Sequence, residues 1–442
     1  MAENYDLVIR GGIVVNHDGT GARDIGVRDG RIVTLGDLAR AGTDQTIDAA
    51  GLHVLPGVID SQVHFREPGN AHKEDLESGS RAAVLGGVTA VFDMPNNAPP
   101  IIDATSLTAK ITAATGRMFC DFAFYAGATG ENTSELAEME RMAGCCGVKV
   151  FMGSSTGSLL VAEEDALACV LNTITRRAAF HSEDEARLNA RRALAAPGRV
   201  ETHEVWRDPE TALRSTQRLL RLARTAGKRV HVLHVSTAQE MDLLVDHKDI
   251  ASVEVTPQHL TLTAPECYAR LGTRAQMNPP LRGQAHSQGL WEGLQNGVVD
   301  VIGSDHAPHT LEEKAKEYPA SPSGMPGVQT LVPVMLTHVA SGKLSLERFV
   351  DLTSHGPGRI FGLARKGRIA AGYDADFTIV DMKARRTIED AWIASRCGWT
   401  PFAGMETTGW SKGTLIRGRT VMWEDEILGS AKGAPMRFQE AL

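Results

Sequence analysis

The sequence predicts an α/β fold in which a (β/α)8 TIM barrel carries a small β-sandwich domain built from both ends of the chain. The middle of the chain alternates apolar, strand-like runs with helical stretches, and eight such units can be counted. The two ends instead show short strands joined by glycine-rich turns. A barrel needs only about 250 residues, so a chain of 442 residues leaves room for the second domain.

The β-sandwich is predicted from matching patterns at the two ends of the chain. Short strands alternate with turns at 7–15, 24–27 and 31–35, and the same texture returns at 367–381 and 413–423. We therefore expect one small domain closed by both termini. The predicted domains are a sandwich of 1–54 plus 364–442 and a barrel of 55–363.

The barrel is predicted from eight consecutive strand and helix units. Its strands are expected at 54–60, 88–94, 121–126, 147–152, 178–181, 230–235, 253–255 and 298–304. The clearest connecting helix begins after Asp208, a good N-cap residue, and ends at Gly227. The polar, Pro/Gly-rich segment 310–327 follows the last strand and is a candidate lid.

Composition excludes several classes of function. The chain has a formal net charge of -8, and it has no basic run or arginine-rich arm, so nucleic acid is not an expected partner. No segment has the ~18 uninterrupted apolar residues of a membrane span, and the N-terminus does not resemble a secretory signal. We expect a cytoplasmic enzyme with a small-molecule substrate. The six cysteines form no C-x-x-C pair and are predicted to be mostly buried, small apolar residues.

Polar residues that suit catalysis follow the predicted barrel strands, where TIM-barrel active sites lie. Alternation along the first strand puts four of them on one face, and the fourth, fifth, sixth and eighth strands contribute one each. They are Asp60, Gln62, His64 and Arg66, and then Lys149, His181, His234 and Asp305. His231 and His234 are three residues apart, which predicts opposite faces. We assign His234 to the barrel mouth and treat His231 as a packed or surface histidine.

Histidine and aspartate at several strand ends indicate a metal-dependent hydrolase. Imidazole and carboxylate are ligands that zinc and similar divalent ions favour, and a catalytic metal keeps one position open for water. Lys149 is harder to assign from its residue type, because a free lysine with a pKa near ~10.4 would repel a metal. Burial can lower that pKa, and a structural lysine paired with an acid is the alternative.

The motifs resemble the amidohydrolase superfamily and, within it, the dihydroorotase branch of the cyclic amidohydrolases. The resemblance spans nearly the whole chain. The motifs are PGVIDSQVHFREPG (56–69), HKEDLESGSRAAVLGGVTAVFDMPN (72–96), GVKVFMGSSTG (147–157), AFHSED (179–184), HVLHVST (231–237), MNPPLR (277–282), GSDHAPH (303–309) and GYDADFTIVD (372–381).

This resemblance implies a divalent metal centre, with zinc as the expected ion and one or two ions per chain. It implies that Lys149 carries a carbamate bridging two metals, that His64 and Asp305 hold one metal, and that His181 and His234 hold the other. Asp305 would also carry the proton from the attacking water to the departing ring nitrogen.

The resemblance further implies how an acidic pyrimidine ring would be bound. Arg66 and Asn96 would grip the substrate carboxylate, His309 would share that anion, and Asn278 would contact the ring. A homodimer or a homotetramer is the expected assembly.

The sequence departs from the family pattern at three glutamines. Gln62 stands where the first histidine of Asp-x-His-x-His belongs, as in a subgroup of dihydroorotase-like proteins, and its amide oxygen is a weaker zinc ligand than imidazole. We therefore expect one firmly held metal beside Lys149, His181 and His234, and a second, labile one. Gln258 and Gln329 also replace commoner residues, without an assigned consequence.

Three functions remain open from the sequence. The first is reversible hydrolysis of dihydroorotate to N-carbamoyl-L-aspartate. The second is a hydantoinase, dihydropyrimidinase or allantoinase, whose substrates lack the ring carboxylate that Arg66 would bind. The third is a catalytically silent subunit that supports a transcarbamoylase.

Overall fold

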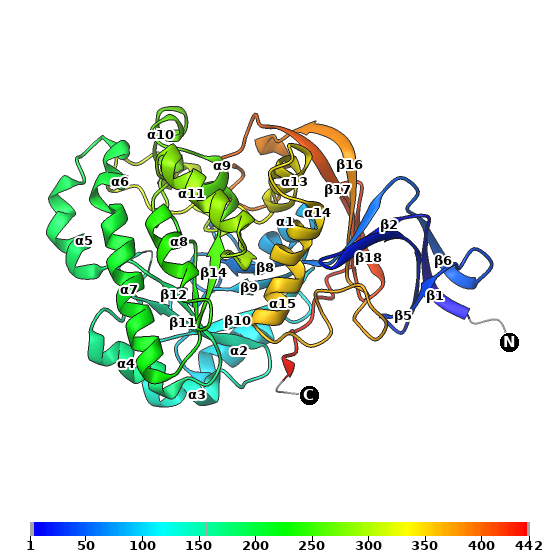
Figure 1. Ribbon diagram of the computed structural model, residues 1–442, viewed down its shortest axis with the longest axis horizontal. Helices are drawn as coiled ribbons and strands as arrows, with labels where there is room; N and C mark the ends of the chain where they lie inside the picture. The colour runs from blue at the N-terminus through cyan, green and yellow to red at the C-terminus, as the bar shows by residue number, and fades with distance from the viewer. Residues whose placement is uncertain (1–3, 156, 440–442) are drawn as a thin grey trace.

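The computed structural model describes residues 4–155 and 157–439 and contains three β-sheets (Figure 1). Residues 1–3, 156 and 440–442, which fall within the predicted domains, lie outside the described residues. The largest sheet is parallel and has the strand order β15-β14-β13-β12-β11-β10-β9-β8. Its strands are β8 (Val58–Val63), β9 (Val88–Asp93), β10 (Asp121–Gly127), β11 (Cys145–Phe151), β12 (Ala178–His181), β13 (Val230–Val232), β14 (Ala251–Val255) and β15 (Val301–Ile302).

This sheet closes into a barrel between its first and last strands. The backbone N–H of His64 donates to His306 O at 2.7 Å, and that of His306 donates to Gln62 O at 3.3 Å. The α-helices surround the barrel or lie at one of its two ends. Their bounds are α1 (Leu76–Gly86), α2 (Ala104–Ala114), α3 (Leu136–Met139), α4 (Glu164–Thr173), α5 (Glu185–Arg191), α6 (His203–Trp206), α7 (Pro209–Ala226), α8 (Ala238–Val245), α9 (Pro257–Thr261), α10 (Glu266–Leu271), α11 (Gln284–Gln295), α12 (Leu311–Lys314), α13 (Leu331–Ala340), α14 (Leu346–Val350) and α15 (Gly356–Ile360). The predicted barrel is confirmed.

Of the two other sheets, the larger contains strands from both ends of the chain, as predicted for the sandwich, and the smaller contains only strands from the N-terminal end. The smaller has the order β5-β4-β1-β6, from β1 (Asn4–Arg10), β4 (Asp24–Arg28), β5 (Arg31–Gly36) and β6 (Gly42–Asp48). The larger has the order β19-β18-β17-β16-β7-β2-β3, from β2 (Ile13–Asn16), β3 (Gly19–Ala22), β7 (His53–Pro56), β16 (Phe377–Thr387), β17 (Glu406–Ile416), β18 (Arg419–Trp423) and β19 (Glu426–Ile427). The two ends of the chain meet where β7 pairs with β16.

The first predicted strand, 54–60, is two strands in the structure. β7 belongs to the sandwich sheet and β8 to the barrel, and Gly57 separates them. A Cβ atom at Gly57 would collide with the side chain of Thr89, so only glycine fits this crossing between the sheets.

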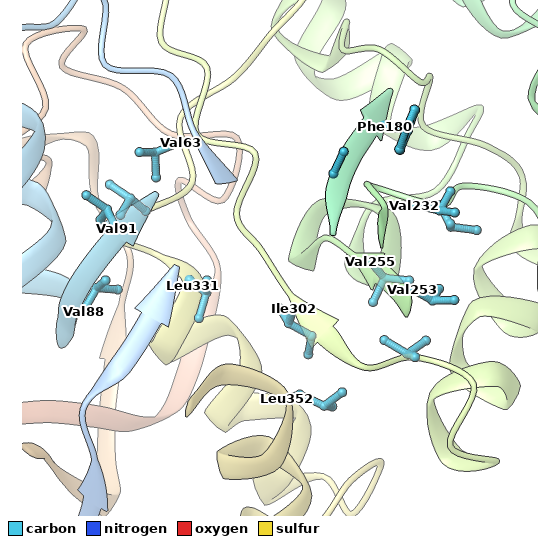
Figure 2. Close-up of a cluster of buried hydrophobic side chains, with 14 of the residues drawn as sticks. Val63, Val88, Val91, Phe180, Val232, Val253, Val255, Ile302, Leu331 and Leu352 are labelled. Atoms are coloured by element: carbon cyan, nitrogen blue, oxygen red, sulfur yellow. The ribbon is translucent and has the colours of Figure 1, made fainter. Parts of the chain in front are cut away.

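Alternation along the barrel strands separates an outer core from an inner one. Outward side chains such as Val91 and Ile302 pack with Leu331 and Leu352 of the surrounding elements (Figure 2). A second apolar cluster joins inward residues of several strands and is closed at the amino end of the barrel by residues such as Phe361 and Phe438. Since Val148, Val150 and Phe180 belong to the outer core, their neighbours Lys149 and His181 point inward.

Within 4–155 and 157–439, none of the helices combines the length and the apolar character that a membrane span would need.

Candidate metal centre and active site

A single cavity at the carboxyl ends of the barrel strands is lined by nine of the ten predicted site residues. These nine are Gln62, His64, Arg66, Asn96, Lys149, His181, His234, Asn278 and Asp305. The tenth, His309, is buried directly behind the cavity, with its Nε2 atom 3.3 Å from Arg66 Nη2. The structure therefore brings together residues that lie far apart in the sequence, from position 62 to position 309.

Lys149 ends in an unpaired amine inside this cavity. Its Nζ atom is buried without a hydrogen-bond partner and lies 4.4 Å from the centre of the Phe151 ring. Burial lowers the pKa of Lys149 to about 7, although Asp305 and Glu254 act in the opposite direction. Among the described residues, no acidic side chain forms an ion pair with Lys149. The alternative of a structural lysine paired with an acid therefore does not hold. A large share of the amine is neutral at neutral pH.

His181 and His234 point their ring nitrogens at each other. Nδ1 of His181 lies 3.0 Å from Nε2 of His234, while the other nitrogen of His181 lies 2.9 Å from Glu183 Oε2. A carboxylate at that position holds a proton on Nε2 and leaves the Nδ1 lone pair turned toward the cavity. Burial, and then the neighbouring His181 and Lys149, keep the pKa of His234 well below its usual value. Both rings are thus available as neutral ligands.

Glu183 is itself fixed by Arg207. The guanidinium donates to Glu183 Oε2 at 2.6 Å and both side chains are buried. Burial acts to raise the pKa of Glu183, but Arg207 and His181 together hold that pKa well below its usual range. The carboxylate that orients His181 is therefore permanently charged.

His64 and Asp305 form a second pair on the other side of the cavity. His64 Nδ1 lies 2.7 Å from Asn96 Oδ1, and its Nε2 lies 3.1 Å from Asp305 Oδ1. If Nδ1 donates to the amide oxygen, the neutral ring turns a lone pair toward the carboxylate oxygen, which is also an acceptor. Two acceptors that face each other at this distance need a cation between them, either a proton or a metal ion.

Gln62 occupies the same side. Its Nε2 donates to Asp305 Oδ1 at 3.0 Å, and its Oε1 is buried with no hydrogen-bond partner. The amide oxygen is therefore the atom that Gln62 has left to offer a cation.

Two predicted ligands have an unusual backbone. His234 has φ 38° and Asp305 has φ 45°, in the left-handed region that residues other than glycine rarely adopt. Such strain gathers at functional sites, where the surrounding structure enforces it.

The prediction that His231 and His234 lie on opposite faces is wrong. β13 ends at Val232, so the backbone has left the strand before His234 is reached. His231 points into the barrel below His234, where its ring nitrogens lie 2.8 Å from Ser252 Oγ and 3.4 Å from Glu254 Oε2. Its interpretation as a packed histidine holds, and it does not line the cavity.

The predicted anion-binding residues surround one end of the cavity. Arg66 Nε donates to Pro308 O at 3.1 Å, and no carboxylate within 4–155 or 157–439 forms an ion pair with Arg66. Burial lowers the pKa of Arg66 to about 10, so the guanidinium stays charged at neutral pH. Burial, opposed by Glu313 and reinforced by Arg66, lowers the pKa of His309 to about 3, so His309 is neutral.

Asn278 is held in position by two neighbours. Its Oδ1 lies 2.9 Å from His203 Nε2, and its Nδ2 donates to Ser155 Oγ at 3.3 Å. These contacts fix the orientation of the Asn278 amide at the cavity.

Sequence reasoning missed five residues that line the cavity, which are Phe151, Ser155, Ala307, Ser323 and Gly324. Ser323 and Gly324 belong to the segment 310–327, whose polar, Pro/Gly-rich composition singled it out as a candidate lid. The buried amine of Lys314 fastens this segment by donating to Gln276 O at 3.1 Å, Pro322 O at 2.8 Å and Gly324 O at 3.0 Å.

The two other unusual glutamines have structural partners. Gln258 Nε2 donates to Ser304 O at 2.7 Å, next to Asp305. Gln329 donates from Nε2 to Trp392 O at 2.7 Å and accepts from the backbone N–H of Ala394 at 2.9 Å. Gln258 thus supports the segment that carries Asp305, and Gln329 ties the barrel to the segment before β17.

The side chains fit a metal centre only if Lys149 or Gln62 takes part. Among the described residues, no group of three or more His, Cys, Asp or Glu side chains is arranged to hold a metal ion. The candidate ligands instead form two pairs, His181 with His234 and His64 with Asp305. The unpaired atoms Lys149 Nζ, Gln62 Oε1 and His234 Nδ1 are buried beside these pairs, which suits a site completed by a cation and by a modified lysine.

The protein is a TIM barrel, and its histidine, aspartate and lysine side chains gather at the carboxyl ends of the strands. These features define the class of barrel hydrolases, which are typically metal-dependent. The chain belongs to the amidohydrolase family, whose sequence model matches residues 53–421. The resemblance found in the motifs is therefore confirmed.

Similar proteins refine this assignment. A dihydroorotase of Methanosarcina mazei is 37% identical over 426 residues, which cover 93% of this chain and 92% of that protein. An allantoinase of Deinococcus radiodurans is 32% identical over 98% of this chain and 99% of that protein. Among solved structures, an L-hydantoinase (dihydropyrimidinase) from Arthrobacter aurescens superposes with a TM-score of 0.94 at 30% identity, covering 98% of this chain and 99% of that one.

Proposed function

We propose that the chain is a dihydroorotase, a cyclic amide hydrolase that reversibly converts dihydroorotate to N-carbamoyl-L-aspartate in pyrimidine biosynthesis. The observation that carries this choice is Arg66, a buried guanidinium at the cavity with no carboxylate partner among the described residues. A buried charge without a counterion is costly unless a ligand neutralises it. Dihydroorotate carries a carboxylate that suits Arg66, whereas hydantoin, dihydrouracil and allantoin do not.

The activities for which two similar proteins are named also support dihydroorotate as the substrate. The Methanosarcina mazei relative is a dihydroorotase, and so is one from Pyrococcus furiosus that is 36% identical over 92% of this chain. The structural similarity to the hydantoinase from Arthrobacter aurescens favours the alternative function, in which the substrate is a ring without a carboxylate. The contacts of Arg66 favour the acidic substrate.

We propose that His181 and His234 would hold one divalent metal, that His64, Asp305 and Gln62 would hold a second, and that Lys149 would contribute to the centre as a carbamate. Zinc suits these ligands. A metal bound there would supply a water with a pKa lowered to about 7 and a positive charge for the oxyanion that develops on the ring carbonyl.

The chain's own residues supply binding and proton transfer in this proposal. Arg66, Asn96 and His309 bind and orient the substrate carboxylate, and Asn278 contacts the ring. The carboxylate of Asp305 takes the proton from the attacking water and delivers it to the ring nitrogen as the C–N bond breaks. In ring closure the same carboxylate works in the reverse direction.

The experiment that tests the function measures turnover of dihydroorotate, hydantoin, dihydrouracil and allantoin on one sample of known metal content. Turnover of dihydroorotate alone is the expected result. Turnover of only the neutral rings would move the chain to the hydantoinase group. Failure to turn over any of the four, with metal bound, would favour a silent subunit that supports a transcarbamoylase.

Light scattering on the same sample tests the expected homodimer or homotetramer, and cell fractionation tests the expected cytoplasmic location.

Replacing Arg66 by methionine is expected to lower kcat/KM for dihydroorotate about 100-fold or more, because a charge-assisted, two-pronged contact with the carboxylate is lost. Steady-state kinetics of ring opening measures this effect. Arg66→Lys, which keeps the charge and loses the planar fork, is expected to fall between wild type and Arg66→Met. Equal kcat/KM in wild type and Arg66→Met would remove the main support for an acidic substrate.

The metal content is expected to reveal the weak ligand at position 62. After dialysis against buffer without metal, one firmly held ion per chain should remain, and a second should return only when metal is supplied. Elemental analysis of the dialysed protein measures this ratio. Gln62→His is expected to retain close to two ions, because imidazole replaces the amide oxygen. Two tightly held ions in the wild-type chain would contradict the assignment of Gln62 as a weak ligand.

A further inference from the structure

A second cavity lies at the opposite end of the barrel and is lined by cationic side chains. Thr175, Arg176 and Arg177 precede β12, and Gly227, Lys228 and Arg229 precede β13, so both groups lie at the amino ends of the strands. Arg359 from α15 and the rings of Phe361 and Phe438 complete the wall. We call it the basal cavity, and its volume is about 420 Å³.

The basal cavity collects positive charge in an otherwise acidic protein. Among the described residues, five arginines and lysines line it and no aspartate or glutamate does. The chain as a whole has a formal net charge of -8. A cavity lined by one sign of charge concentrates ions of the other sign.

Carbonyl and hydroxyl groups hold Arg177 and Lys228 in place without cancelling their charge. Arg177 Nη1 donates to Val230 O at 3.1 Å and to Ser252 Oγ at 2.9 Å, and Lys228 Nζ donates to Ile174 O at 2.5 Å. A guanidinium has five N–H donors, so Arg177 keeps others for a ligand. Arg229 is exposed and forms no hydrogen bond or ion pair with the other residues that the structure describes.

Two cations share the carboxylate of Asp300 beside the cavity. Asp300 Oδ1 lies 3.4 Å from Arg359 Nη2, while its Oδ2 pairs closely with Lys248. Burial, and then repulsion from Arg229, lower the pKa of Arg177 to about 10, although Asp300 acts in the opposite direction. Arg177, Arg229 and Arg359 thus remain close enough to repel one another, which an anion between them would relieve.

We propose that the basal cavity, defined by Arg177, Lys228, Arg229 and Arg359, binds a small molecule that carries two or more phosphate groups. Guanidinium forks match phosphate oxygens, and three of the four cations are arginines. The volume lies within the roughly 300–1,000 Å³ of small-ligand sites. A concave pocket of this size admits a small molecule and not a nucleic-acid duplex. The site is separate from the cavity at the carboxyl ends of the strands and does not depend on the proposed activity.

Titration calorimetry with fructose 1,6-bisphosphate as the probe tests this site on the full-length, metal-loaded protein. One site per chain is expected, with binding that weakens as NaCl rises from about 0.1 M to 0.5 M. The double variant Arg229→Gln, Arg359→Gln alters two exposed side chains and should fold normally, as its thermal unfolding checks. Its affinity is expected to fall about tenfold or more, because two charge-assisted contacts are lost.

Two matched variants locate the site. Arg40→Gln removes an exposed arginine from the turn between β5 and β6 and is expected to leave the affinity unchanged. Arg66→Met is also expected to leave it unchanged, which would exclude binding at the other cavity. Absence of binding, or equal affinity in the double variant, would overturn the proposal. Co-sedimentation with vesicles of phosphatidylcholine and phosphatidylglycerol, without binding of the soluble probe, would also overturn it in favour of a lipid headgroup.

Discussion

Asp305→Asn is expected to lower kcat for ring opening and ring closure by about 10² to 10⁴, because general acid and base catalysis contributes on that scale. Asparagine keeps the shape of the side chain and its contact with Gln62 Nε2, which is 3.0 Å in the wild-type chain. It loses the ability to take a proton from water and to return it to the ring nitrogen. Steady-state kinetics in both directions measures the loss.

Two controls separate proton transfer from other effects of this substitution. Elemental analysis of the same sample shows how much of the loss reflects missing metal, since Asp305 is also a proposed ligand. Asp300→Asn alters a carboxylate at the other end of the same strand, just before β15, and is expected to leave kcat unchanged. If Asp305→Asn kept a tenth or more of wild-type kcat with metal bound, another residue would have to carry the proton.

The sequence predicted the positions of the site residues wherever strand alternation continued to the end of the strand. Lys149 and His181 are such cases, because their neighbours Val148, Val150 and Phe180 are plainly apolar and pack outward. Alternation failed at His231 and His234, because β13 ends at Val232 and the backbone at His234 has φ 38°. Residue type alone did not predict this backbone, since glycine is the usual occupant of the left-handed region and histidine, although enriched there among other residues, adopts it rarely.

Three loop residues of the cavity were beyond the reach of sequence patterns. Ser155, Ser323 and Gly324 line the cavity, but serines and glycines in loops are common and carry no periodicity. The composition of 310–327 predicted that this segment is a loop and a candidate lid, but it did not predict which atoms the loop contacts. Lys314 illustrates this best, because a lysine in a polar stretch is expected to be exposed, whereas this one is buried and donates to three carbonyl oxygens.

The basal cavity could not be predicted from sequence patterns either. Its cations come from segments around 176, 228 and 359, which are separate in the sequence and meet only when the strands close into a barrel. In the sequence, Arg176-Arg177 and Lys228-Arg229 are dipeptides too short to count as a basic run. Their shared position at the amino ends of β12 and β13 follows from the barrel register.

Lys149→Ala is expected to remove bound metal and to lower kcat about 10³-fold or more, since the lysine would supply the ligand shared by both metal positions. The histidine pair and the His64 and Asp305 pair would then have only two strong ligands each, and a stable site usually needs three or four. Elemental analysis and steady-state kinetics on one preparation measure both losses.

The same variant separates a carbamate from a simple amine. If Lys149 acts as an anionic oxygen ligand, acetate or propionate should enter the space left by Lys149→Ala and restore part of the metal and part of the activity. Lys149→Met is the matched control, because its side chain fills that space beside Phe151 and cannot take up carbon dioxide. Rescue confined to Lys149→Ala would support the carbamate. Full metal content and activity in both variants would refute a role for Lys149 in the centre, and the unpaired amine would then need another explanation.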